Sequence, residues 1–109
     1  MLYLKHDVRL TEAQAVVVML AVVQQVFGDQ PCMLTSGIDG VHKVGSLHGV
    51  GLAFDFRTKN LSNMEKDKLV GELKRRLTAD FDVLLESRGE ENEHLHVEFD
   101  PKERGGRDA

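Results

Sequence analysis

The feature that most constrains this chain is a glycine-spaced motif over residues 46–55, followed near the other end by a His-x-His segment. The first segment reads Ser-x-His-x-x-Gly-x-Ala-x-Asp and contains His48 and Asp55, whereas the second contains His94 and His96. Two imidazoles and one carboxylate are the three protein ligands that a catalytic zinc keeps when its fourth position stays open. His48, Asp55 and His96 are therefore predicted to form one metal site.

The composition of the motif supports this interpretation over a structural zinc site. A structural zinc normally has four ligands with cysteines among them, and the chain contains only Cys32. Gly49, Gly51 and Ala53 are small residues that allow close approach of the backbone between the two expected ligands. A zinc ribbon or zinc finger is thus excluded by ligand count.

The two motifs, in this order, resemble those of the zinc D-alanyl-D-alanine metallopeptidases, whose superfamily includes lysostaphin-type peptidases and the hedgehog signalling domain. The resemblance covers about residues 35–100. It implies that His48, Asp55 and His96 bind one zinc ion. It also implies that peptidoglycan peptides are the substrate, cleaved by a D,D-carboxypeptidase or endopeptidase. The alternative hypothesis is a zinc module of the same fold that has lost catalysis.

A zinc peptidase also needs a general base for the water proton. Glu93 lies three residues before His96, the offset of the catalytic glutamate in the peptidases that the chain resembles. A strand would turn Glu93 away from His96, so this role requires Glu93 to lie in a loop. Glu86 and the acidic residues 90–91 are alternatives. The resemblance to lysostaphin-like peptidases implies that His94 assists catalysis.

Other polar residues near the motifs are candidates for supporting roles. In many of the resembled peptidases a Ser-Gly pair is followed by an arginine that holds substrate or the developing oxyanion, but here residues 36–39 read Ser-Gly-Ile-Asp. Arg57 and His42 are weak substitutes for that arginine. Ser46 is expected to hydrogen-bond behind the ligands, because no serine-hydrolase arrangement accompanies it.

Two helices and four strands are expected. A capping box at Thr11 and Gln14 predicts a helix over residues 12–27, and a second box at Ser62 and Glu65 precedes a helical repeat of leucines up to Leu77. Strands are expected over residues 32–35, 52–57, 81–86 and 94–99. The predicted fold class is α+β, with two helices on one face of a mostly antiparallel sheet and zinc on the other.

Length and charge limit the class of protein. The 109 residues, 41% of them hydrophobic, suit a single domain over residues 1–100, with residues 101–109 expected to be a flexible tail. With 14 Lys and Arg against 18 Asp and Glu, the chain does not suit a nucleic-acid partner. The apolar run over residues 15–23 is too short to span a membrane. Nothing in the sequence indicates an oligomeric state.

The start of the chain lacks the charged and apolar pattern of a secretion signal. We therefore expect synthesis in the cytoplasm of a bacterial host. Together with the small size and the resemblance, this suits a bacteriophage enzyme that acts on the cell wall during lysis or as part of the virion.

Overall fold

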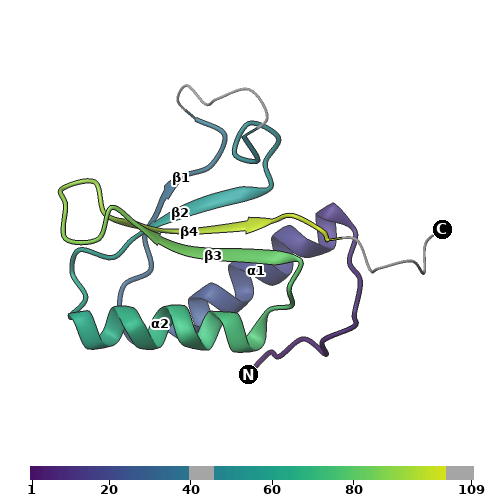
Figure 1. The fold of residues 1–109 in the computed structure, drawn as a ribbon, viewed down its shortest axis with the longest axis horizontal. Coiled ribbons are helices and arrows are strands. Elements are labelled where there is room, and N and C mark those ends of the chain that lie inside the picture. The colour runs from purple at the N-terminus through teal and green to yellow at the C-terminus, as the bar shows by residue number, and fades with distance from the viewer. Residues whose placement is uncertain (40–45, 103–109) are drawn as a thin grey trace.

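A computed structural model of the chain describes residues 1–39 and 46–102. Its elements are, in chain order, α1 (Glu12–Phe27), β1 (Leu34–Ser36), β2 (Ala53–Arg57), α2 (Asn63–Arg76), β3 (Phe81–Glu86) and β4 (His94–Phe99) (Figure 1). The described chain is thus a small α+β fold, as predicted. The bounds of α1, β3 and β4 match the predicted ranges, whereas β1 begins two residues later than expected.

The strands form one antiparallel sheet in the order β1-β2-β4-β3. Strand β4 therefore lies between β2 and β3. Strand β2 contains the last three residues of the glycine-spaced motif. The register pairs Asp55 of β2 with His96 of β4, and pairs His94 with Arg57 on one side and Glu86 on the other. Two segments that are far apart in the sequence become neighbours in the sheet.

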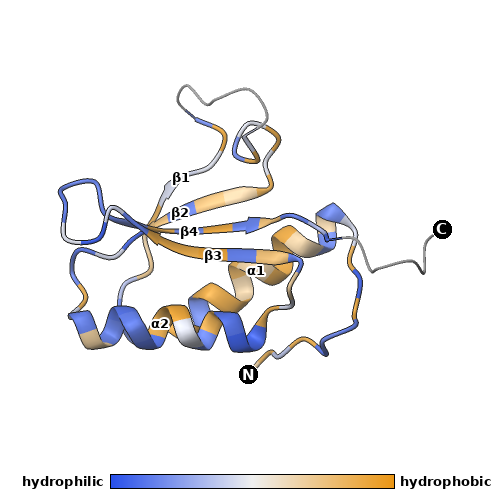
Figure 2. Ribbon diagram, in the orientation of Figure 1, coloured by the Kyte–Doolittle hydropathy of each residue, from blue (hydrophilic) through white to orange (hydrophobic). Residues whose placement is uncertain are grey.

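The strands alternate between a core face and a polar face. Leu95, Val97 and Phe99 of β4 are at most 2% exposed, and they pack in one cluster with apolar residues of both helices. Both helices therefore cover the same face of the sheet, and α1 is the more hydrophobic of the two (Figure 2). Because successive side chains of a strand point to opposite faces, His94 and His96 lie on the other face.

Both predicted capping boxes are confirmed. Thr11 Oγ1 accepts a hydrogen bond from the Gln14 N–H, and the Gln14 side chain accepts one from the Thr11 N–H. Ser62 and Glu65 make the same reciprocal pair at the start of α2. These contacts satisfy backbone donors that a helix leaves without an internal partner, so both helices begin where the sequence indicates.

The ends of the described chain are attached to the body. The Leu4 N–H donates to the Arg76 carbonyl at 2.8 Å, and the Lys102 N–H donates to Asp80 Oδ1 at 2.9 Å. Most of the expected tail, residues 103–109, lies outside the described residues. Within the described part of the chain, no helix is both long and apolar enough to cross a membrane.

Candidate metal centre

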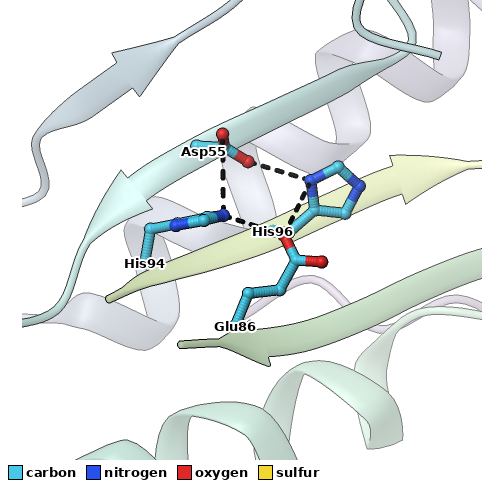
Figure 3. A group of neighbouring side chains, drawn as sticks. All are labelled: Asp55, Glu86, His94 and His96. Carbon is cyan, nitrogen blue, oxygen red and sulfur yellow. Dashed lines mark hydrogen bonds and ion pairs between the residues drawn. The ribbon is translucent and has the colours of Figure 1, made fainter. Parts of the chain in front are cut away.

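Three strands bring four polar side chains together on the face of the sheet opposite the helices. Asp55 comes from β2, His94 and His96 from β4, and Glu86 from the end of β3, with their polar ends turned toward one another (Figure 3). One possible ligand atom from each of these residues lies within 4.8 Å of the others. The group is therefore a candidate metal site, as the motifs predicted for Asp55 and His96.

His48 reaches the same cluster from the turn before β2. The turn is built by hydrogen bonds from the Gly49 N–H to the Ser46 carbonyl and from the Gly51 N–H to the His48 carbonyl. Gly51 has a φ of 77°, a conformation that glycine adopts without strain. The turn places His48 Nε2 3.1 Å from Asp55 Oδ1 and 3.2 Å from His96 Nδ1. The three predicted ligands are thus brought together.

The far nitrogen of each imidazole is anchored by an oxygen that accepts its proton. His48 Nδ1–H donates to the Gly37 carbonyl at 3.0 Å, and His96 Nε2–H donates to the Glu98 carboxylate at 2.7 Å. His94 Nδ1–H donates to the carbonyl of residue 92 at 2.8 Å. In each ring the other nitrogen then faces the cluster, which is how metal-binding histidines are oriented by their neighbours.

The three predicted ligand atoms fit one zinc ion. His96 Nδ1 lies 2.9 Å from Asp55 Oδ1, and His48 Nε2 is within 3.2 Å of both. Two ligands of a tetrahedral zinc, each about 2.1 Å from the ion, lie about 3.4 Å apart. The observed separations are close to this value, so His48, Asp55 and His96 could hold a zinc ion with little movement.

The pKa values of the cluster reflect its mixed charges. The hydrogen bond with Asp55 raises the pKa of His96 to about 9, with a further contribution from Glu98 and against the effect of burial. Burial alone would raise the pKa of Asp55, but the hydrogen bond from His96 and the three imidazoles hold it below its usual value. Burial likewise opposes the rise in the pKa of His94, which its contacts with residue 92, Glu86 and Asp55 cause. In the metal-free cluster His96 is therefore protonated at neutral pH and donates to Asp55, and a metal ion bound there would replace this proton.

Exposure differs between the members of the cluster. The side chains of His48 and His96 are 9% and 11% exposed, whereas that of Glu86 is 44% exposed. The predicted ligands are thus recessed, and Glu86 lies at the more exposed rim of the cluster. A cavity of about 610 Å³ lies elsewhere, beside the helices, and none of its lining residues belongs to the cluster.

The structure does not bring Glu93, the expected general base, to the cluster. Strand β4 begins at His94, and the Glu93 side chain turns toward α2, where its Oε1 accepts hydrogen bonds from Lys66 Nζ at 2.8 Å and the Gly89 N–H at 2.9 Å. Its Oε2 accepts from Thr58 Oγ1 at 2.6 Å. Burial alone would raise the pKa of Glu93, but these three donors lower it to about 2. Glu93 therefore lies in the loop before β4, as the role of general base required, but its three donors hold the carboxylate away from the cluster.

The remaining sequence candidates occupy different positions. Ser46 Oγ accepts from the His48 backbone N–H at 3.3 Å, so Ser46 supports the turn that carries the ligand. Arg57 is exposed and pairs with His94 in the sheet register, on the strand face that also carries Asp55. His42, the other weak substitute for the missing arginine, lies outside the described residues. Residues 90–91 are exposed in the β3–β4 loop.

Sequence reasoning missed the groups that orient the rings. Glu98 is two residues after His96 in the same strand, so strand alternation alone could have placed it beside that histidine. The carbonyls of Gly37 and Asn92 carry no sequence signal, because every residue has a backbone carbonyl, whatever its side chain.

Comparisons of the chain with models of protein families, with curated proteins and with solved structures found no match. The interpretation of the cluster as a possible metal site therefore rests on its geometry.

Proposed function

We propose that the chain is a zinc-dependent peptidase that hydrolyses peptide bonds of peptidoglycan, as a D,D-carboxypeptidase or an endopeptidase. The observation that carries the proposal is the convergence of His48 Nε2, Asp55 Oδ1 and His96 Nδ1 within 3.2 Å of one another. In their neutral forms both rings turn an acceptor nitrogen toward the carboxylate oxygen, because the proton of each ring is donated elsewhere. A divalent cation among the three atoms would satisfy all of them together.

The number of ligands favours catalysis. Structural zinc normally has four protein ligands, whereas a catalytic zinc has three and an open position. Bound here, zinc would supply a Lewis acid that lowers the pKa of a coordinated water to about 7 and polarises the scissile carbonyl. His48, Asp55 and His96 would hold the ion, and Gly37 and Glu98 would keep the two rings oriented.

Glu86 is the carboxylate best placed to transfer the proton. Its Oε1 lies 2.8 Å from His94 Nε2 and 3.9 Å from His96 Nδ1, and its side chain is open to water and substrate. In the proposed reaction, Glu86 Oε1 accepts a proton from the attacking water and returns it to the leaving amine, while His94 orients the carboxylate. We assign a structural role to Glu93, because both of its carboxylate oxygens accept hydrogen bonds, from Lys66 and two further donors.

The substrate class rests on the resemblance of the two motifs to the D-alanyl-D-alanine peptidases. Arg57 lies in the same row of the sheet as His94 and is exposed, so we assign to it a contact with an anionic group of the substrate. This contact would replace the arginine that is missing after Ser36 and Gly37.

A zinc-binding module without catalysis is the second candidate function. It is favoured by Ile38 and Asp39, which stand where many of the resembled peptidases carry the arginine, and by the engagement of Glu93 with Lys66. Such a module would bind zinc as tightly as the enzyme and turn over no peptide.

The first test is the zinc content of the purified protein. The chain is stripped with a chelator, dialysed against zinc chloride and then buffer, and measured by elemental analysis. We expect at least one zinc per chain in the wild type, and loss of this ion in His96→Ala. His6→Ala is the matched control, because His6 is an exposed histidine outside the cluster. Absence of zinc uptake by the wild type would refute both candidate functions.

The second test is turnover by the zinc-loaded protein. An acetylated Lys-D-Ala-D-Ala peptide and purified peptidoglycan are incubated with it, and released D-alanine and new amines are measured. We expect product from the wild type and none from Glu86→Gln, which should retain the ion held by His48, Asp55 and His96. Zinc binding without product from either substrate would favour the module without catalysis.

A further inference from the structure

We propose that the cluster contains a second metal site, formed by Asp55 Oδ2, Glu86 Oε1 and His94 Nε2, which shares Asp55 with the first. The second site rests on its own geometry. Its effect on turnover rests on the proposed function.

The two oxygens of Asp55 face different partners. Oδ1 lies 3.1 Å from His48 Nε2 and 2.9 Å from His96 Nδ1, which are the atoms of the first site. Oδ2 lies 3.8 Å from His94 Nε2, on the side of the cluster that Glu86 completes. A carboxylate with its two oxygens in two ligand groups can bridge two metal ions, as in the two-metal sites of hydrolases.

The second group contains suitable donors at suitable separations. His94 Nε2 is 2.8 Å from Glu86 Oε1, and one imidazole with two carboxylates is a donor set that zinc accepts. Two ligands about 2.1 Å from one zinc ion are about 3.4 Å apart in a tetrahedral arrangement. The observed separations of 2.8 and 3.8 Å lie on either side of this value.

The orientation of His94 is an independent observation in favour of the site. Its Nδ1–H donates to the Asn92 carbonyl at 2.8 Å, so the hydrogen bond directs Nε2 toward Glu86 and Asp55. The rings of His48 and His96 are anchored in the same way by Gly37 and Glu98. All three histidines of the cluster therefore share the arrangement that orients metal-binding imidazoles.

The charge of the cluster leaves room for a second cation. Asp55, Glu86 and Glu98 carry three negative charges when ionised, and the three imidazoles carry none when neutral. One dication reduces the sum from −3 to −1, so a second dication still enters a negative environment. It binds more weakly than the first, because the first ion repels it and because Glu86 is more exposed than the first three ligands.

Occupation of the second site has a functional consequence. The ion would take the Glu86 oxygen that accepts the water proton in the proposed reaction, and would take His94, which orients that carboxylate. The second zinc therefore inhibits the peptidase, whereas the first activates it. The concentration of free zinc would thus regulate turnover, through Glu86 of β3 and His94 of β4.

The experiment is a calorimetric titration of the metal-stripped wild type with zinc chloride, checked by elemental analysis after equilibrium dialysis. We expect two equivalents, the second weaker, and only one in His94→Ala. Asp100→Asn is the matched control, because Asp82, Glu98 and Asp100 form the other possible metal-binding group among the described residues. Circular dichroism verifies that each variant is folded. The wild-type titration needs no variant, so a single equivalent there overturns the second site.

Two further outcomes also overturn it: a second equivalent that persists in His94→Ala, or one that disappears in Asp100→Asn. Turnover measured across the same titration is expected to rise with the first equivalent and fall with the second. Two equivalents without turnover at any zinc level would leave the second site standing and refute the proposed peptidase. One equivalent with full turnover would do the reverse.

Discussion

The buried carboxylate of Glu93 provides the sharpest test of the structure, through the substitution Glu93→Gln. The side chain of Glu93 is 1% exposed and that of Lys66 is 10% exposed, with Lys66 Nζ 2.8 Å from Glu93 Oε1. The substitution keeps the shape of the side chain and removes its charge, so Lys66 is left buried beside a neutral amide. Loss of one partner of a buried ion pair is costly, because the other charge remains desolvated.

The magnitude follows from the pKa of Glu93, which its three donors lower from 4.5 to about 2. At about 1.4 kcal/mol per pH unit, ionised Glu93 contributes about 3 kcal/mol to the free energy of unfolding. Because the folded-state pKa is the lower one, the contribution is complete above the unfolded-state value and is lost as the pH falls through the folded-state value. At pH 3 it should be about 40% of its value at pH 7.

Urea unfolding followed by circular dichroism measures this effect. We expect Glu93→Gln to be about 3 kcal/mol less stable than the wild type at pH 7, and the difference to narrow below pH 4.5. Glu90→Gln, an exposed substitution in the same loop, should change stability by less than about 0.5 kcal/mol. Lys66→Met should cost less in the Glu93→Gln background than alone, because the pair is already broken.

A loss below about 1 kcal/mol for Glu93→Gln, with no narrowing at low pH, would refute this reasoning. It would mean that the carboxylate is not held by Lys66, Thr58 and Gly89 in solution. The role of general base, expected from the position of Glu93 three residues before His96, would then deserve renewed testing.

Three further predictions concern the core, a helix end and the site. Leu95→Ala empties a fully buried position, so the free energy of unfolding should fall by about 3 kcal/mol in urea titrations, and a loss under about 1 kcal/mol would contradict the packing. Ser62→Ala removes the N-cap of α2 and should cost about 1 kcal/mol, whereas an unchanged stability would argue against the capping box. Glu98→Gln weakens the anchor of His96 and should lower zinc affinity about 10-fold to 100-fold in competition with a chelator, with an unchanged circular dichroism spectrum; unaltered affinity would contradict the anchoring role.

Local patterns in the sequence predicted much of the fold. The capping residues Thr11 and Gln14 set the start of α1, because a capping box needs only four neighbouring residues. The strand predicted over residues 94–99 matches the bounds of β4, and the two-residue spacing of His94 and His96 puts both side chains on one face of it. Strand β1 was less well predicted, because it is three residues long and its bounds depend on pairing with β2, where the register is irregular.

For the candidate site, too, the sequence predicted the local features and the tertiary structure decided the rest. The sequence by itself determined that His48, Asp55 and His96 are a possible ligand set, because the residue types and the spacing of each motif are local properties. Only the tertiary structure decided which carboxylate joins them. The β3–β4 register places Glu86 beside His94, whereas Glu93, in the loop before β4, pairs with Lys66 of α2. Such choices depend on strand pairing and side-chain direction in three dimensions, which sequence offsets do not encode.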